Sequence, residues 1–124
     1  MTHKKNSDLT VLYIPHGGGP LPLFNHPGHL ELIRFLKNIP DQLETPDAII
    51  VISAHWEQSI PTLTAKAVPP LIYDYYGFVP EAYEIDYPAP GDPLLAKKLW
   101  AGLEAKGIHS QLEERWGFDH GMYI

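Results

Sequence analysis

A nearly unbroken run of apolar and mostly β-branched residues at 47–54 (DAIIVISA) limits the folds that are open to this chain. A strand with this pattern has no polar face, so it is stable only where both faces of its sheet are covered. A shorter run of the same kind, TVLYIP at 10–15, ends at a proline. The two runs predict neighbouring, buried strands of a parallel sheet.

Two helices are expected from start and stop signals. The first begins near Pro27, because proline suits the first helical position, and ends before Pro40. Its apolar face follows the i, i+3, i+4, i+7 spacing and consists of Leu32, Phe35, Leu36 and Ile39. The second begins at Asp92-Pro93, an N-cap followed by proline, and ends near Gly107.

The order of strands and helices predicts the fold class. Two further short strands are expected at 60–65 and 108–112. Strands that alternate with helices predict an α/β fold, with a mostly parallel or mixed sheet flanked by helices and a metal site at the carboxyl ends of the strands. Because 124 residues make a chain of ordinary domain size, we expect residues 1–124 to form a single domain.

Composition excludes several classes of function. The chain has no cysteine, which rules out disulfide scaffolds, thiolate zinc sites and cysteine nucleophiles. Its net charge of −6 argues against a nucleic-acid partner. No apolar run approaches the about 18 residues of a membrane span, and the polar N-terminus is no signal peptide, so we expect no membrane partner and a cytoplasmic location. The seven histidines are the first residues to consider for chemistry.

Two of the histidines directly follow the predicted strands. His16 comes after the strand at 10–15 and opens a glycine-rich loop, whereas His55 ends the strand at 47–54. Neighbouring parallel strands are about 4.8 Å apart and their carboxyl ends share one sheet edge, so both imidazoles are expected to converge on one metal ion. Either histidine alone is more often a polar surface group, and the metal hypothesis depends on the two positions being equivalent.

Other polar residues near these positions have more than one interpretation. Glu57 would complete a two-histidine, one-carboxylate iron site, but a solvated residue or an acceptor that fixes a histidine tautomer is favoured. His120 is a third candidate, either as a further ligand or as a proton shuttle, and Asp119 before it is interpreted as a loop or cap residue. His26 and His29 flank the first helix start and are interpreted as structural or exposed.

Five motifs occur in order along the chain: PHGGGP at 15–20, SAHWE at 53–57, YDYYGF at 73–78, YPAPGDP at 87–93 and DHG at 119–121. Together they resemble the DODA-type class III extradiol ring-cleaving dioxygenases. The resemblance implies a mononuclear metal, Fe(II) for activity and often Zn(II) when isolated, with a catechol-type substrate and dioxygen. It implies that His16 and His55 are the first two metal ligands. It also implies that His120, at the metal pocket, moves protons and is sometimes a ligand.

Members of this family are longer, and a further metal-binding histidine lies in the part that follows. We therefore expect residues 1–124 to be the N-terminal part of a longer catalytic domain. Uncovered sheet edges and apolar surfaces pair readily, so we expect a homo-oligomer or a second chain that supplies the C-terminal half.

The expected function is a ring-opening, extradiol (meta-cleaving) dioxygenase that acts on a catechol-type aromatic with a mononuclear non-haem metal. Whether the 124-residue chain is active alone is left open. One alternative is a zinc-dependent hydrolase, because Zn²⁺ lowers the pKa of bound water to about 7. The other is a non-catalytic fragment that binds metal.

Overall fold

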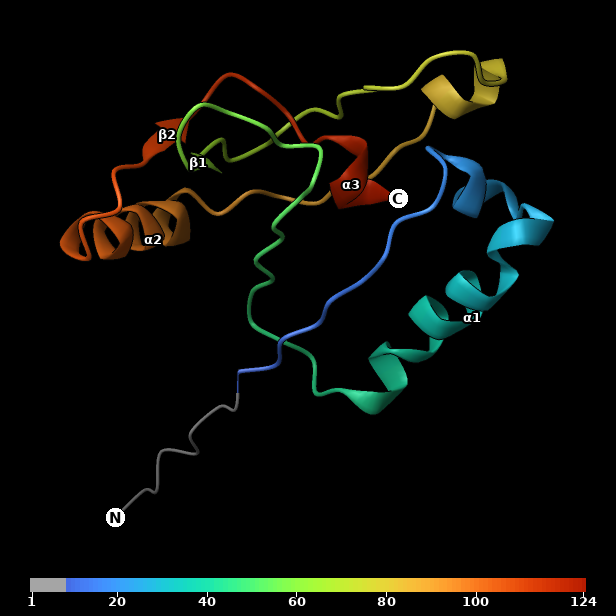
Figure 1. Cartoon of the computed structure of the whole chain (residues 1–124), viewed down its shortest axis with the longest axis horizontal. Helices are drawn as coiled ribbons and strands as arrows, with labels where there is room; N and C mark the ends of the chain where they lie inside the picture. Colours follow the sequence, from blue (N-terminus) through green and yellow to red (C-terminus); the bar gives the residue numbers. More distant parts are fainter. Residues whose placement is uncertain (1–8) are drawn as a thin grey trace.

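A computed structural model describes residues 9–124 of the chain (Figure 1). These residues form an α/β arrangement with a small parallel sheet. The elements in chain order are the 3₁₀ turns η1 (Leu21–Phe24) and η2 (Pro27–His29), helix α1 (Leu30–Asn38), the turn η3 (Pro40–Gln42), strand β1 (Thr62–Thr64), the turn η4 (Pro80–Tyr83), helix α2 (Pro93–Ala105), strand β2 (Gln111–Glu113) and helix α3 (His120–Tyr123).

Strands β1 and β2 are parallel neighbours connected by helix α2. Their register pairs Leu63 with Leu112, and α2 packs against both strands. Figure 1 shows α2 directly beneath the strand pair. Strand β1 lies within the predicted range 60–65, and β2 overlaps the end of the predicted range 108–112. This β1–α2–β2 unit confirms the prediction of a parallel, helix-connected sheet on a small scale.

Helix α2 begins and ends where the sequence predicted. The side chain of Asp92 accepts a hydrogen bond from the backbone amide of Leu95 at 2.9 Å, with Pro93 at the first helical position. Gly107, with φ of 76°, follows the end of the helix. At 13 residues α2 is the longest helix described, and within residues 9–124 no helix is long and apolar enough to cross a membrane.

Helix α1 forms as predicted but is poorly covered. The turn η2 precedes it, so the regular helix starts three residues after Pro27. It contacts the turns η1, η2 and η3 and lies on the opposite side of Figure 1 from α2. None of its residues is buried, and Phe35 on its apolar face is 49% exposed. The apolar face therefore lacks a covering layer among the described residues.

The two strands predicted most strongly from the sequence, at 10–15 and 47–54, do not form. Both segments are irregular and make no backbone ladder within residues 9–124. Their side chains are exposed, with Tyr13 and Ile52 both 95% accessible. A strand that is apolar on both faces needs neighbouring strands and covering layers, and the described residues supply neither. The prediction of a larger sheet built on these segments is therefore wrong for residues 9–124.

A second parallel contact joins Leu71 to Phe118 as an isolated bridge. Backbone hydrogen bonds of 2.7 and 2.8 Å flank it. Gly117 permits this approach, because a Cβ there would lie 1.8 Å from a neighbouring carbonyl oxygen. Asp74 follows Leu71 by three residues and His120 follows Phe118 by two, so both come at the carboxyl end of the bridge. This pair of segments, and not the expected pair, brings polar residues together at one edge.

The best-packed region of the described chain surrounds this bridge and α3. Tyr123 is the one large hydrophobic residue among those that are buried, and the others are the alanines Ala65, Ala82 and Ala96. Asp119 and His120 are buried as well, with 6% and 8% of their surfaces exposed. Buried polar residues are usually hydrogen-bonded or functional. The region around α3 is therefore the place to look for a site.

Candidate metal centre

Three histidines from distant parts of the sequence meet beside α3. The ring centroids of His55 and His120 are 3.9 Å apart, and those of His16 and His55 are 4.7 Å apart. His55 therefore contacts both other rings. The expected proximity of His16 and His55 is confirmed, although neither follows a strand. Loops and turns, and not strand ends, hold the two residues in place.

A carboxylate joins two of these histidines. The ligand atoms of His55, Asp74 and His120 all lie within 4.8 Å of one another. Metal–nitrogen and metal–oxygen bonds are about 2.0–2.2 Å, so two donors to one ion are at most about 4.4 Å apart. The group is therefore close to the size of a metal site. Glu57, which the sequence offered as the carboxylate, is exposed and lies outside the group, as does His16.

The donor atoms in this cluster fit a divalent metal ion. Nε2 of His55 is buried and has no hydrogen-bond partner. Nδ1 of His120 also lacks an aligned hydrogen bond, although Oδ1 of Asp74 lies 2.8 Å away at an oblique angle. Burying an unpaired nitrogen costs free energy, and a metal ion that accepts the lone pair of Nε2 of His55 would remove that cost. Imidazole nitrogen and carboxylate oxygen together suit zinc and iron.

The charge states of the cluster also favour a cation. Burial lowers the pKa of His55, and the neighbouring His120 and His16 lower it further. His55 is therefore neutral near neutral pH, which is the form that binds metals. Burial acts to raise the pKa of Asp74, but hydrogen bonding from the backbone amide of His120 and contact with its ring outweigh burial and hold the pKa below its usual range.

A hydrogen-bond chain connects the loop of His55 to the turn that carries His120. The Ser53 hydroxyl donates to Oδ1 of Asp119 at 2.6 Å and accepts the backbone amide of His55 at 3.1 Å. The same carboxylate oxygen accepts the amide of Gly121 at 2.8 Å and so caps α3. The interpretation of Asp119 as a cap is confirmed. A Cβ at Gly121 would lie 2.3 Å from the Ser53 hydroxyl, so only glycine permits this approach.

The glycine-rich loop positions His16. Nδ1 of His16 donates to the carbonyl of Gly17 at 2.8 Å, which leaves Nε2 with a free lone pair. The amide of Gly18 donates to Nε2 of His29 at 3.0 Å. A Cβ on Gly17 would lie 2.5 Å from the His29 ring. His29 therefore has a structural role, as the sequence indicated, and holds the loop that carries His16.

Aromatic residues form a wall beside His120. The edge of Tyr75 meets the His120 ring in a T-shaped contact with centroids 5.6 Å apart. The hydroxyl groups of Tyr73, Tyr75 and Tyr123 all donate to backbone carbonyls. Burial raises the pKa of Tyr75 and Tyr123, so both stay protonated. With their polar tips occupied, these rings present apolar faces and edges to the site.

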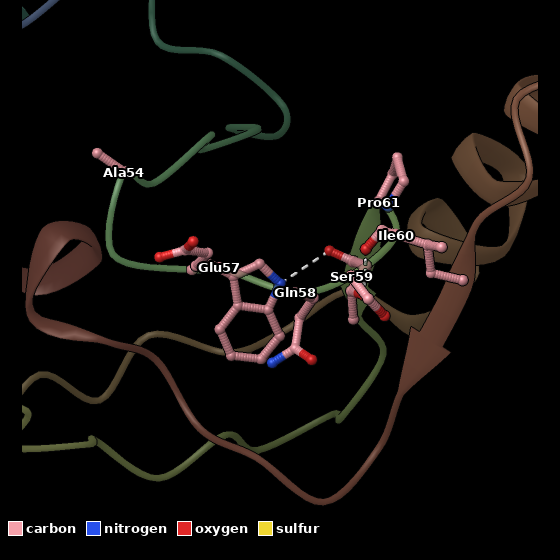
Figure 2. A pocket seen from close by; sticks show the side chains of 8 residues that line it. Ala54, Glu57, Gln58, Ser59, Ile60 and Pro61 are labelled. Atoms are coloured by element: carbon pink, nitrogen blue, oxygen red, sulfur yellow. Dashed lines mark hydrogen bonds between the residues drawn. The ribbon is translucent and has the colours of Figure 1, made fainter.

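An open pocket lies along the residues that follow the cluster (Figure 2). Its lining is Ala54, Trp56, Glu57, Gln58, Ser59, Ile60, Pro61 and Thr62. The Trp56 indole donates a 2.9 Å hydrogen bond to the carbonyl of Thr62, which a dashed line marks in Figure 2. None of the three clustered histidines lines this pocket. It is therefore beside the candidate metal centre and not part of it.

Most of the chain matches a known protein family. Residues 13–124 match the family described as the catalytic LigB subunit of aromatic ring-opening dioxygenase. The chain belongs to the LigB family. The resemblance to extradiol dioxygenases that the five motifs indicated is thereby confirmed.

Individual relatives of this LigB-family chain agree with that assignment. The chain is 44% identical over 124 residues to the dioxygenase tasH of Hapsidospora irregularis, covering 92% of this chain and 38% of that protein. It is 34% identical over 114 residues to a 4,5-DOPA dioxygenase extradiol of Mirabilis jalapa, covering 90% and 42%. It is 43% identical over 81 residues to a protein of the same name from Escherichia coli K12, covering 65% and 30%. The chain thus spans less than half the length of these relatives.

Sequence reasoning singled out the three histidines of this cluster but did not single out the carboxylate of Asp74 beside them. Asp74 stands within the YDYYGF motif, and the motif was the signal that could have marked it. Its role depends on the bridge between Leu71 and Phe118, which has no signature in the local sequence. The link from Ser53 to Asp119 was missed for the same reason.

Proposed function

We propose that this chain contributes to a ring-opening extradiol dioxygenase that acts on a catechol-type aromatic with a mononuclear non-haem metal. One observation carries the proposal. In a chain of the LigB family, three histidines and an aspartate from separate segments meet around the buried imidazole of His120, which the ring of Tyr75 contacts. A zinc-dependent hydrolase, the alternative that the sequence left open, is not favoured by the family match.

The proposed metal ligands among these residues are His16 and His55, and His120 is a third ligand only in the alternative to its proton-moving role. His55 offers a buried Nε2 without a partner, and His16 offers an Nε2 left free by its loop contact. We propose Fe(II) as the active metal, and Zn(II) fits the same donors. The bound ion supplies a Lewis-acid and redox centre that brings the aromatic substrate and dioxygen together.

The proposed catalytic residue is His120. Its imidazole is buried beside Asp74 and Tyr75, and imidazole is the side-chain group most often used in general acid–base catalysis. In this role His120 takes a proton from a catechol hydroxyl and returns one as the ring opens. The tyrosine rings exclude water on one side and lie where an aromatic substrate would pack.

We further propose that the site is completed by polypeptide from outside these 124 residues. The chain covers 38% of the tasH dioxygenase, and its segments 10–15 and 47–54 expose large apolar side chains. Residues 1–124 are then the N-terminal part of a catalytic domain. The remaining part is supplied by the same polypeptide, by a second chain or by another copy in a homo-oligomer.

Anaerobic Fe(II) reconstitution of the chain together with the polypeptide that completes its site, followed by addition of DOPA and air, tests the activity. We expect oxygen uptake together with a new absorbance of a ring-opened product. His55→Ala should abolish both signals, whereas His109→Ala, the same change at an exposed histidine, should preserve them. Protein that holds one Fe(II) per chain but consumes no oxygen with DOPA or with simple catechols would contradict the proposal and support a non-catalytic, metal-binding fragment.

A further inference from the structure

We propose that Asp74 is a positioning residue for His120: it holds the imidazole through Nδ1 and so presents Nε2 as the nitrogen that exchanges protons. The inference rests on the role proposed above for His120. It assigns to Asp74 a function other than metal ligation.

The geometry ties one carboxylate oxygen to two atoms of the same residue. Oδ1 of Asp74 accepts the backbone amide of His120 at 2.9 Å and lies 2.8 Å from Nδ1 of its ring. The first contact fixes the main chain from which the ring projects, and the second contacts the ring itself. The ring contact is oblique here, and such hydrogen bonds often align only when a site is fully assembled.

The carboxylate selects one tautomer of the ring. A neutral imidazole carries its proton on either Nδ1 or Nε2, and the pH alone does not decide between them. An ionised carboxylate beside Nδ1 can only accept, so it stabilises the proton on Nδ1. The lone pair then resides on Nε2. Carboxylates fix the tautomer of functional histidines in this way in many metal sites.

The neighbours of His120 restrict rotation of its imidazole ring. The residue is 8% exposed. The ring of His55 lies against it at 3.9 Å, and the edge of Tyr75 approaches at 5.6 Å. Rotation of the imidazole would therefore require these neighbours to move, and Asp74 is the group that meets it at Nδ1.

The other carboxylate nearby is already engaged. Oδ1 of Asp119 accepts hydrogen bonds from the Ser53 hydroxyl and the amide of Gly121. Asp119 thus organises the turn of α3, while Asp74 contacts the ring. Asp74 is placed by the backbone bridge at Leu71, so its position does not require a bound ion.

Nitrogen-15 NMR of the ring tests this inference on the full protein, both metal-free and loaded with diamagnetic Zn(II). We expect a pyrrole-like signal for Nδ1 of His120 and a pyridine-like signal for Nε2, with and without Zn(II). Asp74→Asn should move the metal-free tautomer equilibrium toward the Nε2–H form, and Asp41→Asn, an exposed aspartate outside the cluster, should not. A pyridine-like Nδ1 in the wild-type protein would overturn the proposal without any variant.

Metal content and kinetics of the Fe(II)-loaded protein distinguish positioning from ligation. Loss of such a supporting carboxylate typically costs about 10–100-fold. We expect Asp74→Asn to lower kcat by that factor with KM and iron content nearly unchanged. Loss of iron from this variant would instead make Asp74 a ligand and overturn the inference. If the wild-type protein shows no turnover, the proposed function fails, while the NMR result still decides the role of Asp74.

Discussion

Individual side chains in the candidate centre owe their properties to close neighbours. The pKa of His55 is lowered because its ring is partly buried and because two other imidazoles adjoin it. Gly121 is required because the Ser53 hydroxyl occupies the space that a side chain would need. Single atoms therefore decide both the chemistry and the packing of this site.

His55→Ala is expected to reduce metal affinity at least tenfold, because it removes the imidazole that contacts both other histidines. Equilibrium dialysis followed by elemental analysis measures the metal bound per chain. His109→Ala is the matched control, since the side chain of His109 is 79% exposed and lies outside the cluster. Equal metal content in the two variants would show that His55 is not a ligand.

Gly121→Ala is expected to lower the free energy of unfolding by about 1–3 kcal/mol, the usual cost of forcing extra atoms into a packed site. The added Cβ would lie 2.3 Å from the Ser53 hydroxyl and break its contact with Asp119. Urea denaturation measures the change. Gly102→Ala in α2 meets no atom within 4 Å and should be neutral or stabilising. Similar destabilisation by both variants would contradict this account of Gly121.

Elements of secondary structure divide into those with local signals and those without. Helix α2 has an N-cap, an N-terminal proline and a terminating glycine, and it formed as predicted. Segments 10–15 and 47–54 have strong strand composition but no partner among the described residues. Capping depends on residues a few positions apart, whereas a strand depends on a neighbour elsewhere in the chain.

Asp92→Ala is expected to cost about 1 kcal/mol of stability, because the amide of Leu95 loses its acceptor. The midpoint of urea unfolding should fall while the dependence on urea concentration stays unchanged. Asp86→Ala, which removes an exposed loop aspartate, provides the comparison. An Asp92 variant as stable as the Asp86 variant would mean that the cap contributes nothing.

Taken together, the described residues bury little apolar surface and expose much of it. The buried hydrophobic residues are mostly alanines, while the segments 10–15 and 47–54 expose large side chains. Apolar surface of this extent is typical of regions that pack against further polypeptide. This agrees with the proposal that residues from outside the 124 cover these segments.

Ile52→Asp is expected to reduce assembly with the covering polypeptide more than about tenfold, because burying an unpaired carboxylate costs several kcal/mol. Light scattering of the protein, with or without a separately produced C-terminal part of a LigB relative, measures the assembled fraction. Leu94→Asp changes an apolar residue on α2 that is 73% exposed and should have little effect. Equal behaviour of the two variants would show that segment 47–54 is not an interface.

Local sequence determined helices α1 and α2, the end residues of α2 and the identity of the clustered histidines. Those features rest on contacts within a few residues or on side-chain chemistry alone, so they can be recognised along the chain. Tertiary structure decided that Asp74, and not Glu57, joins His55 and His120, and that segments 10–15 and 47–54 do not pair with each other. These outcomes depend on which distant surfaces are present to make contact, and no local pattern specifies that.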